Sequence, residues 1–206
     1  MKALIVYAHP NPKSFCKAIA DVAREELERL GHEVRLHDLY AQGWSPALGP
    51  EDFEALFKGT VREDVAREQA DVLWADLLVF VYPIWWYERP AMVKGWFDRV
   101  FSVGFAYQAT AQGIQGLLGG RRALVLTTSG ADEESDRKSG MTEAMRVTVM
   151  SGSLRSTGLN PVHYKNYFAV PLVTDARRAE MLEDVRAQVR AVLAEQRAAE
   201  PANAGW

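Results

Sequence analysis

The sequence predicts a doubly wound α/β domain with a five-stranded parallel sheet in the order 2-1-3-4-5. Short runs that are almost entirely apolar recur along the chain, as expected of strands buried on both faces. Segments with apolar residues at helical spacing follow each of these runs. Strand–helix repeats joined by right-handed crossovers form an open parallel sheet with helices on both faces.

Each predicted strand stops at turn-forming or polar residues. Residues 3–8 (ALIVYA) are apolar throughout and end at His9-Pro10. Residues 33–40 instead alternate between apolar and polar side chains, which is also typical of a strand. The expected strands are residues 3–8, 33–40, 76–81, 122–128 and 161–170.

The first predicted helix begins after Ser14, a suitable N-cap, and ends at Gly31. The helix over residues 90–104 carries two adjacent apolar stripes, wider than contact with one sheet requires. We therefore expect something beyond its own sheet to cover it. Residues 41–59 are expected to form a long irregular connection. The remaining helices are expected over residues 63–74, 142–156 and 175–196.

Length and composition exclude several classes of protein. The chain has 206 residues, of which 48% are hydrophobic and 25% charged, and this fits one packed domain rather than a disordered, collagen-like or disulfide-rich chain. We expect a single domain over residues 1–198 and a frayed tail over 199–206. The net charge of −3 gives no reason to expect nucleic acid as a partner.

The expected location is the cytoplasm. Cys16 is the only cysteine, so neither an internal disulfide nor a multi-cysteine metal site can form. No signal peptide precedes the first apolar run. The longest apolar run, residues 77–87, is too short to span a bilayer and contains a proline.

Ligands of open α/β sheets bind beyond the carboxyl ends of the strands, so the loops after the first, third and fourth strands form the candidate site. Residues 9–15 (HPNPKSF) lack the dinucleotide-binding glycine motif, and the chain has no P-loop. The loop nevertheless leads into a helix N-terminus, whose free N–H groups suit a phosphate, with Ser14 and Lys13 or His9 as further donors. A Ser14 that only caps the helix and a His9 that only closes a turn explain these residues equally well.

The second loop, residues 82–90 (YPIWWYERP), places Trp85, Trp86 and Tyr87 at a strand end. Large aromatic rings with polar handles suit a planar, half-polar ligand, and the alternative is that they pack as lids over the core. The third loop, residues 127–130 (TTSG), offers hydroxyl groups and close backbone approach. The acidic stretch that follows, residues 131–136, is expected to be a solvated loop.

Motifs for metal enzymes and serine hydrolases are missing. The four histidines lack metal-ligand spacing, and neither Ser129 nor Ser153 lies in a Gly-x-Ser-x-Gly elbow. A phosphate pocket beside an aromatic pocket at this edge of the sheet points to a flavin.

At these residues the sequence resembles the flavodoxin-like NAD(P)H quinone oxidoreductases. This family includes animal quinone reductases, bacterial drug-activity modulators and the ancillary oxidoreductases of potassium-efflux systems. The most specific match is residues 90–101 followed by Phe105-Ala-Tyr107. The other matching segments are residues 3–15, 75–86 and 126–130.

The resemblance implies a flavin cofactor (FAD or FMN, with FAD slightly favoured), NAD(P)H as co-substrate and a quinone-like acceptor. It also implies a homodimer joined through the helical segment over residues 90–101. It implies that Trp86 and Tyr107 line the substrate pocket, and that Gln69 lies near the cofactor of the neighbouring subunit. The residues implied to surround the flavin phosphate are His9, Ser14, Phe15 and Cys16. Those implied to line the two edges of the flavin ring are Pro83, Ile84, Trp85, Trp86, Tyr87, Thr127, Thr128, Ser129 and Gly130.

The sequence departs from the family at three places. Cys16 stands where asparagine is usual, and Ser129 replaces the first glycine of a Thr-Thr-Gly-Gly. Residues 131–141 contain neither the tyrosine nor the histidine that the resemblance implies as a proton shuttle, so no catalytic side chain is assigned. The alternatives are a flavin-bearing regulatory subunit with a membrane-protein partner, an electron carrier, and a flavin-free binding module.

Overall fold

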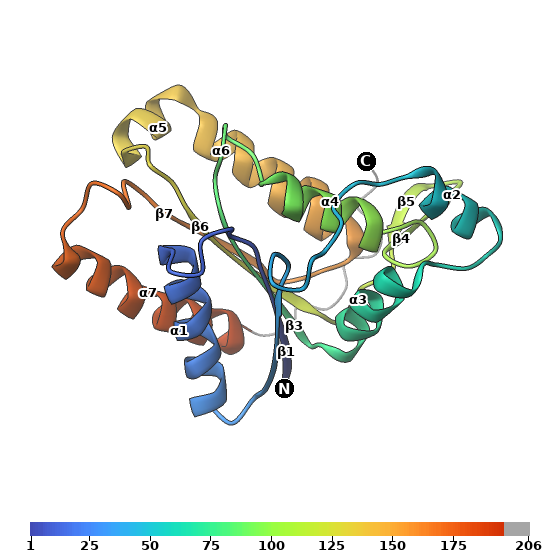
Figure 1. The fold of residues 1–206 in the computed structure, drawn as a ribbon, viewed down its shortest axis with the longest axis horizontal. Helices are drawn as coiled ribbons and strands as arrows, with labels where there is room; N and C mark the ends of the chain where they lie inside the picture. Colours follow the sequence, from blue (N-terminus) through green and yellow to red (C-terminus); the bar gives the residue numbers. More distant parts are fainter. Residues whose placement is uncertain (196–206) are drawn as a thin grey trace.

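The central sheet has five parallel strands in the order β2-β1-β3-β6-β7 (Figure 1). This computed structural model describes residues 1–195. The strands are β1 (Lys2–Tyr7), β2 (Glu33–Asp38), β3 (Leu77–Pro83), β6 (Arg122–Thr128) and β7 (Val162–Tyr167). Numbered along the chain, this order is 2-1-3-4-5, so the predicted fold class and topology are confirmed. All residues of β3 and β6 are buried, which explains why β3 and the middle of β6 (residues 123–126) are continuous apolar runs.

One face of the sheet is covered by α1 (Phe15–Arg29) and α7 (Asp175–Ala194) (Figure 1). Apolar side chains such as Ile19 and Val185 are fully buried there. The two helices are also joined by the buried carboxylate of Glu26, which accepts hydrogen bonds from Arg29 at 2.7 and 2.8 Å and from Arg190 at 2.8 Å. The hydrogen bonds from Arg29 are the main cause that lowers the pKa of Glu26 to about 2.

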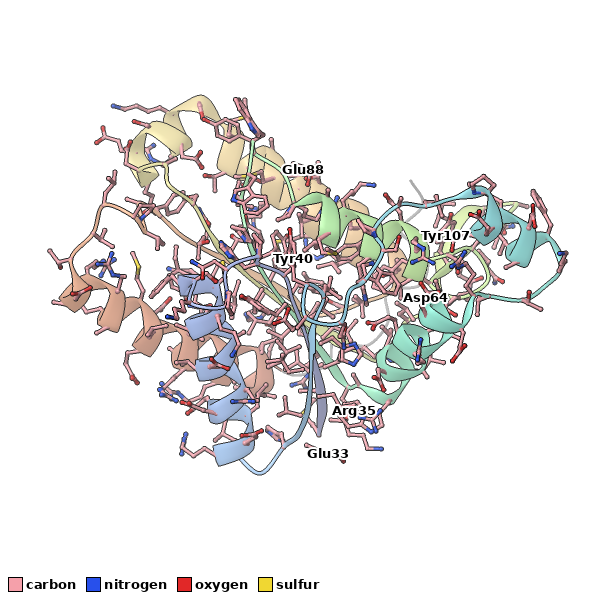
Figure 2. The ribbon with its side chains drawn as sticks, in the orientation of Figure 1. Glu33, Arg35, Tyr40, Asp64, Glu88 and Tyr107 are labelled. Carbon is pink, nitrogen blue, oxygen red and sulfur yellow. The ribbon has the colours of Figure 1, made fainter. Side chains whose placement is uncertain are left out.

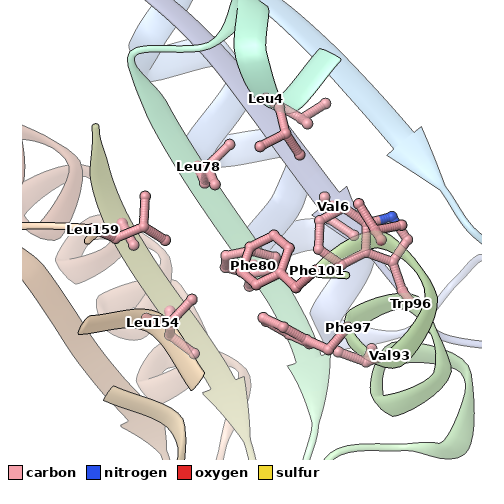
Figure 3. Packing of buried hydrophobic residues seen from close by; sticks show 14 of the residues in the cluster. Leu4, Val6, Leu78, Phe80, Val93, Trp96, Phe97, Phe101, Leu154 and Leu159 are labelled. Carbon is pink, nitrogen blue, oxygen red and sulfur yellow. The ribbon is translucent and has the colours of Figure 1, made fainter. Parts of the chain in front are cut away.

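The other face is covered by α3 (Glu63–Trp74), α4 (Ala91–Val100) and the helical segment η1 (Val147–Leu154). Along the chain, η1 is preceded by α6 (Met141–Arg146) and followed by η2 (Arg155–Thr157). Trp96 and Phe97 of α4 pack around Phe80 of β3, with ring centroids 5.7 and 5.0 Å from the Phe80 ring (Figure 3). The helix predicted over 142–156 is divided into three segments, α6, η1 and η2, of which η1 has the wider π-helical turn.

The wide apolar surface of α4 is covered within the chain itself. Trp96 is 0% exposed and Phe97 7%. The connection after β2 packs against the same helix so closely that a Cβ at Gly95 would lie 1.9 Å from the carbonyl oxygen of Pro46. The expectation that something beyond its own sheet covers this helix is therefore confirmed, because α3 and residues 41–49 pack on it within the chain. A dimer contact through the same helix stays a prediction.

Two helices and one β-hairpin were not expected from the sequence. The irregular connection contains α2 (Pro50–Phe57), residues 107–116 form the hairpin β4 (Tyr107–Thr110) and β5 (Gly113–Gly116), and the acidic stretch begins α5 (Glu133–Ser139). Asp136 of α5 is 4% exposed, so this stretch is not simply a solvated loop. The last helix ends at Ala194, before the predicted end at Gln196. The domain boundary at 198 and the tail over 199–206 lie outside the described residues.

Within residues 1–195, no helix is both long and apolar enough to cross a bilayer. The same part of the chain holds no cluster of histidine, cysteine or acidic side chains that could bind a metal ion.

Candidate functional site

The three loops expected to form a site meet at the carboxyl ends of β1, β3 and β6. The Sγ atom of Cys16 lies 3.1 Å from Oγ1 of Thr128. The N–H of Ile84 donates to the carbonyl oxygen of Thr128 at 2.7 Å. The rings of His9 and Trp85 stand edge to face with centroids 5.9 Å apart. The sequence therefore identified the segments that form this edge of the molecule.

The first loop is held by its own side chains. The N–H of Asn11 donates to Nδ1 of His9 at 3.0 Å, and the N–H of Lys13 donates to Oδ1 of Asn11 at 2.9 Å. Burial lowers the pKa of His9 below its usual value, which favours the neutral ring. Since Nδ1 accepts a hydrogen bond, the neutral ring carries its hydrogen on Nε2 and can donate it to a ligand.

Ser14 is the N-cap of α1. Its Oγ accepts from the N–H of Lys17 at 3.2 Å and lies 3.2 Å from the Tyr7 hydroxyl. Burial raises the pKa of Tyr7 to about 12, so this hydroxyl stays neutral. The N–H groups of Phe15 and Cys16 come first in the helix and have no carbonyl one turn earlier to bond. The cap therefore leaves the positive end of the helix dipole available to an anion.

The side chains of Phe15 and Cys16 point away from such an anion. Phe15 packs on the buried cluster between α1 and the sheet, and Cys16 is 2% exposed. The thiol of Cys16 contacts Thr128, and burial raises its pKa to about 11. Both residues can thus offer a phosphate their backbone N–H groups, while their side chains hold α1 in place.

The second loop forms a tight turn of strained residues. Trp85 and Glu88 exchange two backbone hydrogen bonds of 3.1 Å, and the two residues between them, Trp86 and Tyr87, have φ values of 52° and 59°. Positive φ at both central positions is the pattern of a type I′ turn, which normally contains asparagine and glycine. Side chains other than these cost about 1–3 kcal/mol at each position.

This turn holds its rings in the open. Trp86 is 97% exposed, Tyr87 50% and Trp85 41%, so none of them is a lid packed into the core. Below the turn, Pro83 is buried at the end of β3 and Ile84 is half-buried. An exposed indole on a strained turn is typical of a surface that binds a planar ligand.

In the third loop the threonine hydroxyls are already bonded inside the protein. Thr127 is fully buried and donates to Oδ1 of Asn166 at 2.9 Å, while Thr128 contacts Cys16. The amide Nδ2 of Asn166 then donates to Oγ of Ser129 at 3.0 Å. Because Ser129 accepts this hydrogen bond, its own hydroxyl hydrogen is left for an outside acceptor. Gly130 is exposed beside it, with nothing within 4 Å of an added Cβ.

Asn166 was missed by sequence analysis. It lies on β7, where the strand register pairs it with Thr127. The order of the predicted strands already makes these two segments neighbours. What the sequence does not show is the register of β7 against β6, and this register places the Asn166 amide beside Thr127 and Ser129.

Gln69 and Tyr107 lie away from the three loops. The Nε2 of Gln69 donates to the carbonyl oxygen of Val100 at 3.0 Å and to Oγ of Ser102 at 3.1 Å, at the C-terminal end of α4. Tyr107 lines a cavity of about 240 Å³ beside Ser102. The Trp86 turn instead precedes α4, whose ten residues span about 15 Å. Figure 2 shows Glu88 and Tyr107 at opposite ends of this helix, so one chain does not bring Trp86 and Tyr107 into a common pocket.

A second cavity of about 350 Å³ lies at the carboxyl end of β7, between Lys165, Arg177 and Asp184. Neither cavity is lined by Trp85, Trp86 or Tyr87. The three loops (residues 9–15, 82–90 and 127–130) thus form an open surface rather than an enclosed pocket. Its groups are the helix N–H groups, an imidazole donor, an exposed indole and the Ser129 hydroxyl, and these fit a ligand that joins a phosphate to a flat, partly polar ring, as a flavin does.

A doubly wound parallel sheet in the order 2-1-3-4-5, with the candidate loops at its switch point, is the architecture of flavodoxin-like proteins. The chain belongs to the Flavodoxin_2 family, described as having a flavodoxin-like fold, whose model matches residues 1–192.

The chain is similar to proteins named as dehydrogenases and quinone oxidoreductases. It is 37% identical over 158 residues to a ribosyldihydronicotinamide dehydrogenase-like protein of Penicillium crustosum, covering 65% of this chain but 59% of that protein. It is 33% identical over 201 residues to the ribosyldihydronicotinamide dehydrogenase [quinone] of Homo sapiens, covering 88% of this chain and 87% of that one. The structure of the NAD(P)H:quinone oxidoreductase from Methanothermobacter marburgensis matches with a TM-score of 0.86 at 30% identity, covering 95% and 98% of the two chains.

Proposed function

We propose that this protein is a flavin-dependent NAD(P)H oxidoreductase that reduces quinones or similar electrophilic aromatic compounds in a ping-pong cycle. One observation carries the proposal, namely that a helix N-terminus, an exposed aromatic turn and a hydroxyl loop converge on one edge of a flavodoxin-like sheet. The similarity to proteins named as quinone oxidoreductases supports it.

In this proposal the protein supplies position and electrostatics. The first-turn N–H groups of α1 and the Nε2–H of His9 bind the flavin phosphate. The backbone from Pro83 to Tyr87 and the loop from Thr127 to Gly130 hold the two edges of the ring. The hydroxyl of Ser129, oriented by Asn166, donates to an acceptor atom of that ring. A bound flavin supplies the hydride chemistry that connects NAD(P)H to the acceptor.

We also propose a cytoplasmic homodimer with FAD as the favoured flavin. The separation of Trp86 from Tyr107 supports the dimer, because a substrate pocket that contains both residues needs Tyr107 from a second copy. Gln69 lies at the same end of α4 as Tyr107 and would accompany it toward the partner's cofactor. An electron carrier or a regulatory subunit is less well supported, since the relatives are named as oxidoreductases.

The visible absorption spectrum of the purified protein tests this function. After incubation with excess FAD or FMN and desalting, the protein should retain the flavin, and heat-released flavin identifies which one. Anaerobic NADH or NADPH should then bleach the flavin absorbance, and a quinone should restore it. A protein that retains neither flavin, or whose bound flavin does not bleach, would contradict the proposal.

A further inference from the structure

Next to the Trp86 turn is a buried arginine that the proposed reaction does not use. Arg89 follows Glu88 and precedes α4, and its side chain is 6% exposed. Its guanidinium lies over the ring of Phe97, 5.0 Å from the centroid. A buried guanidinium is retained only where it is paired, so its partners indicate what it holds.

The partners of Arg89 come from the turn and from η1. Oε1 of Glu88 accepts from the backbone N–H of Arg89 at 2.8 Å and from its Nε at 3.1 Å. The Nη1 group donates to Oγ of Ser153 at 2.8 Å, and this hydroxyl donates in turn to the carbonyl oxygen of Thr148 at 3.2 Å. Both roles of the Ser153 hydroxyl are satisfied, so the arrangement is a continuous link from the turn to the helix.

The hydrogen bonds of Arg89 help to hold the strained turn in its conformation. Trp86 and Tyr87 both have positive φ, and the 97% exposed ring of Trp86 has almost no packing of its own to hold it. Glu88 closes the turn by its backbone and joins Arg89 by its carboxylate. A strained turn persists only where its surroundings over-determine it.

We propose that Arg89 is a positioning residue. Together with Glu88 and Ser153 it acts as a clamp that fixes the conformation of the Trp86–Tyr87 turn. The Trp86 ring is then already placed, before any ligand binds, to stack on the flavin ring or the substrate. The effect of the clamp on flavin affinity rests on the proposed function. The clamp itself is a property of the protein without ligand. Preformed order lowers the entropy lost on binding, so the clamp acts on affinity without touching the ligand.

The test removes the side chain of Arg89 and, separately, the backbone strain at Tyr87. Arg89→Met removes the guanidinium but keeps an apolar side chain over Phe97. Tyr87→Gly relieves one of the two strained positions. Lys94→Met is the matched control, because it removes an exposed cation of the neighbouring helix. The probes are FAD and FMN titrated into each protein, and the ¹⁹F spectrum of ligand-free protein labelled with 5-fluorotryptophan, in which Trp86→Phe assigns the Trp86 resonance.

We expect Arg89→Met to weaken flavin binding about tenfold and to shift or broaden the Trp86 resonance, because charged hydrogen bonds to the turn are lost. Ser153→Ala should do the same to a smaller extent, and Lys94→Met should change neither. Adding Tyr87→Gly to Arg89→Met should recover at least half of the lost affinity on a logarithmic scale, since a relaxed turn needs no clamp.

Two outcomes would overturn the proposal. One is an Arg89→Met protein with an unchanged Trp86 resonance, and the other is a loss of affinity that Tyr87→Gly does not rescue, which would indicate a general packing role. If the wild-type protein binds neither flavin, the proposed function fails, and the ¹⁹F spectra and their rescue by Tyr87→Gly still decide the clamp.

Discussion

Cys16 and Thr128 form a contact between α1 and β6 that joins two of the ligand loops. The resemblance places asparagine at this position, and its replacement by cysteine removes a side-chain amide that could bind a phosphate. The Cys16 side chain does not face the candidate phosphate site. It is 2% exposed, and its thiol lies 3.1 Å from the Thr128 hydroxyl inside the protein. A phosphate bound here would be held by the backbone N–H groups of the helix end, which do not depend on the side chain.

This position predicts a slow reaction of Cys16 with thiol reagents. Burial raises its pKa to about 11, and the thiolate is the reactive form. The native protein at pH 7.5 should react with a disulfide reagent at least about 100-fold more slowly than the protein unfolded in guanidinium. Cys16→Ser should give no signal in either state. Stoichiometric modification of native protein within seconds would contradict the structure.

At the scale of elements, His37 joins β2 to α3 and α4. Its Nδ1 lies 2.8 Å from Oε2 of Glu68, and its Nε2 lies 2.8 Å from Oδ2 of Asp71. The Nε1–H of Trp96 also donates to Oε2 of Glu68 at 2.8 Å. With a carboxylate at each nitrogen, both ring nitrogens act as donors, which only the charged imidazole can do.

This arrangement makes part of the stability dependent on pH. Burial lowers the pKa of His37, but the hydrogen bonds and charges of Glu68 and Asp71 outweigh it, so the pKa stays above its usual 6.5. The stabilisation is therefore complete below pH 6.5 and is lost as the pH rises through the raised pKa.

His37→Gln should lower the free energy of unfolding at pH 6 by about 1–3 kcal/mol and by less at pH 9. Denaturant unfolding at the two pH values measures this difference. An equal loss at both would show that the charge of His37 contributes nothing.

The elements that could be predicted are those whose pattern has a single explanation. The run ending at Val81 is apolar at every position because β3 is covered on both faces. The short helix α2 was missed although Pro50 occupies its first turn, since eight residues give too little periodicity. The helix α5 was missed because its acidic side chains suggested solvent, while Asp132 caps it by accepting from the N–H of Ser135.

For the candidate site, loop positions could be predicted but side-chain directions could not. Strand order alone places Ser14, Trp86 and Ser129 on one edge. Whether a hydroxyl faces a ligand or the protein depends on register, as the bond from Thr127 to Asn166 illustrates. A cover over the apolar stripes of α4 could be predicted, but residues 41–49 could not be identified as part of it, because an irregular connection has no periodicity that shows what it packs against.

At the scale of the whole molecule, α4 separates the two halves of the proposed substrate pocket. The Trp86 turn precedes it, whereas Tyr107 and Gln69 lie beyond its end. In a twofold homodimer each pocket would combine Trp86 of one copy with Tyr107 of the other, and the same patch would be used twice. Dimerisation would then be required for catalysis and would not merely accompany it.

Mixing two impaired variants shows whether each substrate pocket combines residues of two copies or of one. Trp86→Ala and Tyr107→Ala should each reduce quinone turnover by on the order of tenfold, because each removes an aromatic wall of every pocket. When they are unfolded and refolded together in equal amounts, about half of the dimers should contain one copy of each variant. Each such dimer has one pocket with both aromatic residues and one with neither, so activity should recover to about a quarter of the wild-type value. Refolding each variant alone is the control. A mixture whose activity stays at the mean of the two variants would place Trp86 and Tyr107 in the same chain's pocket or remove Tyr107 from the substrate pocket altogether.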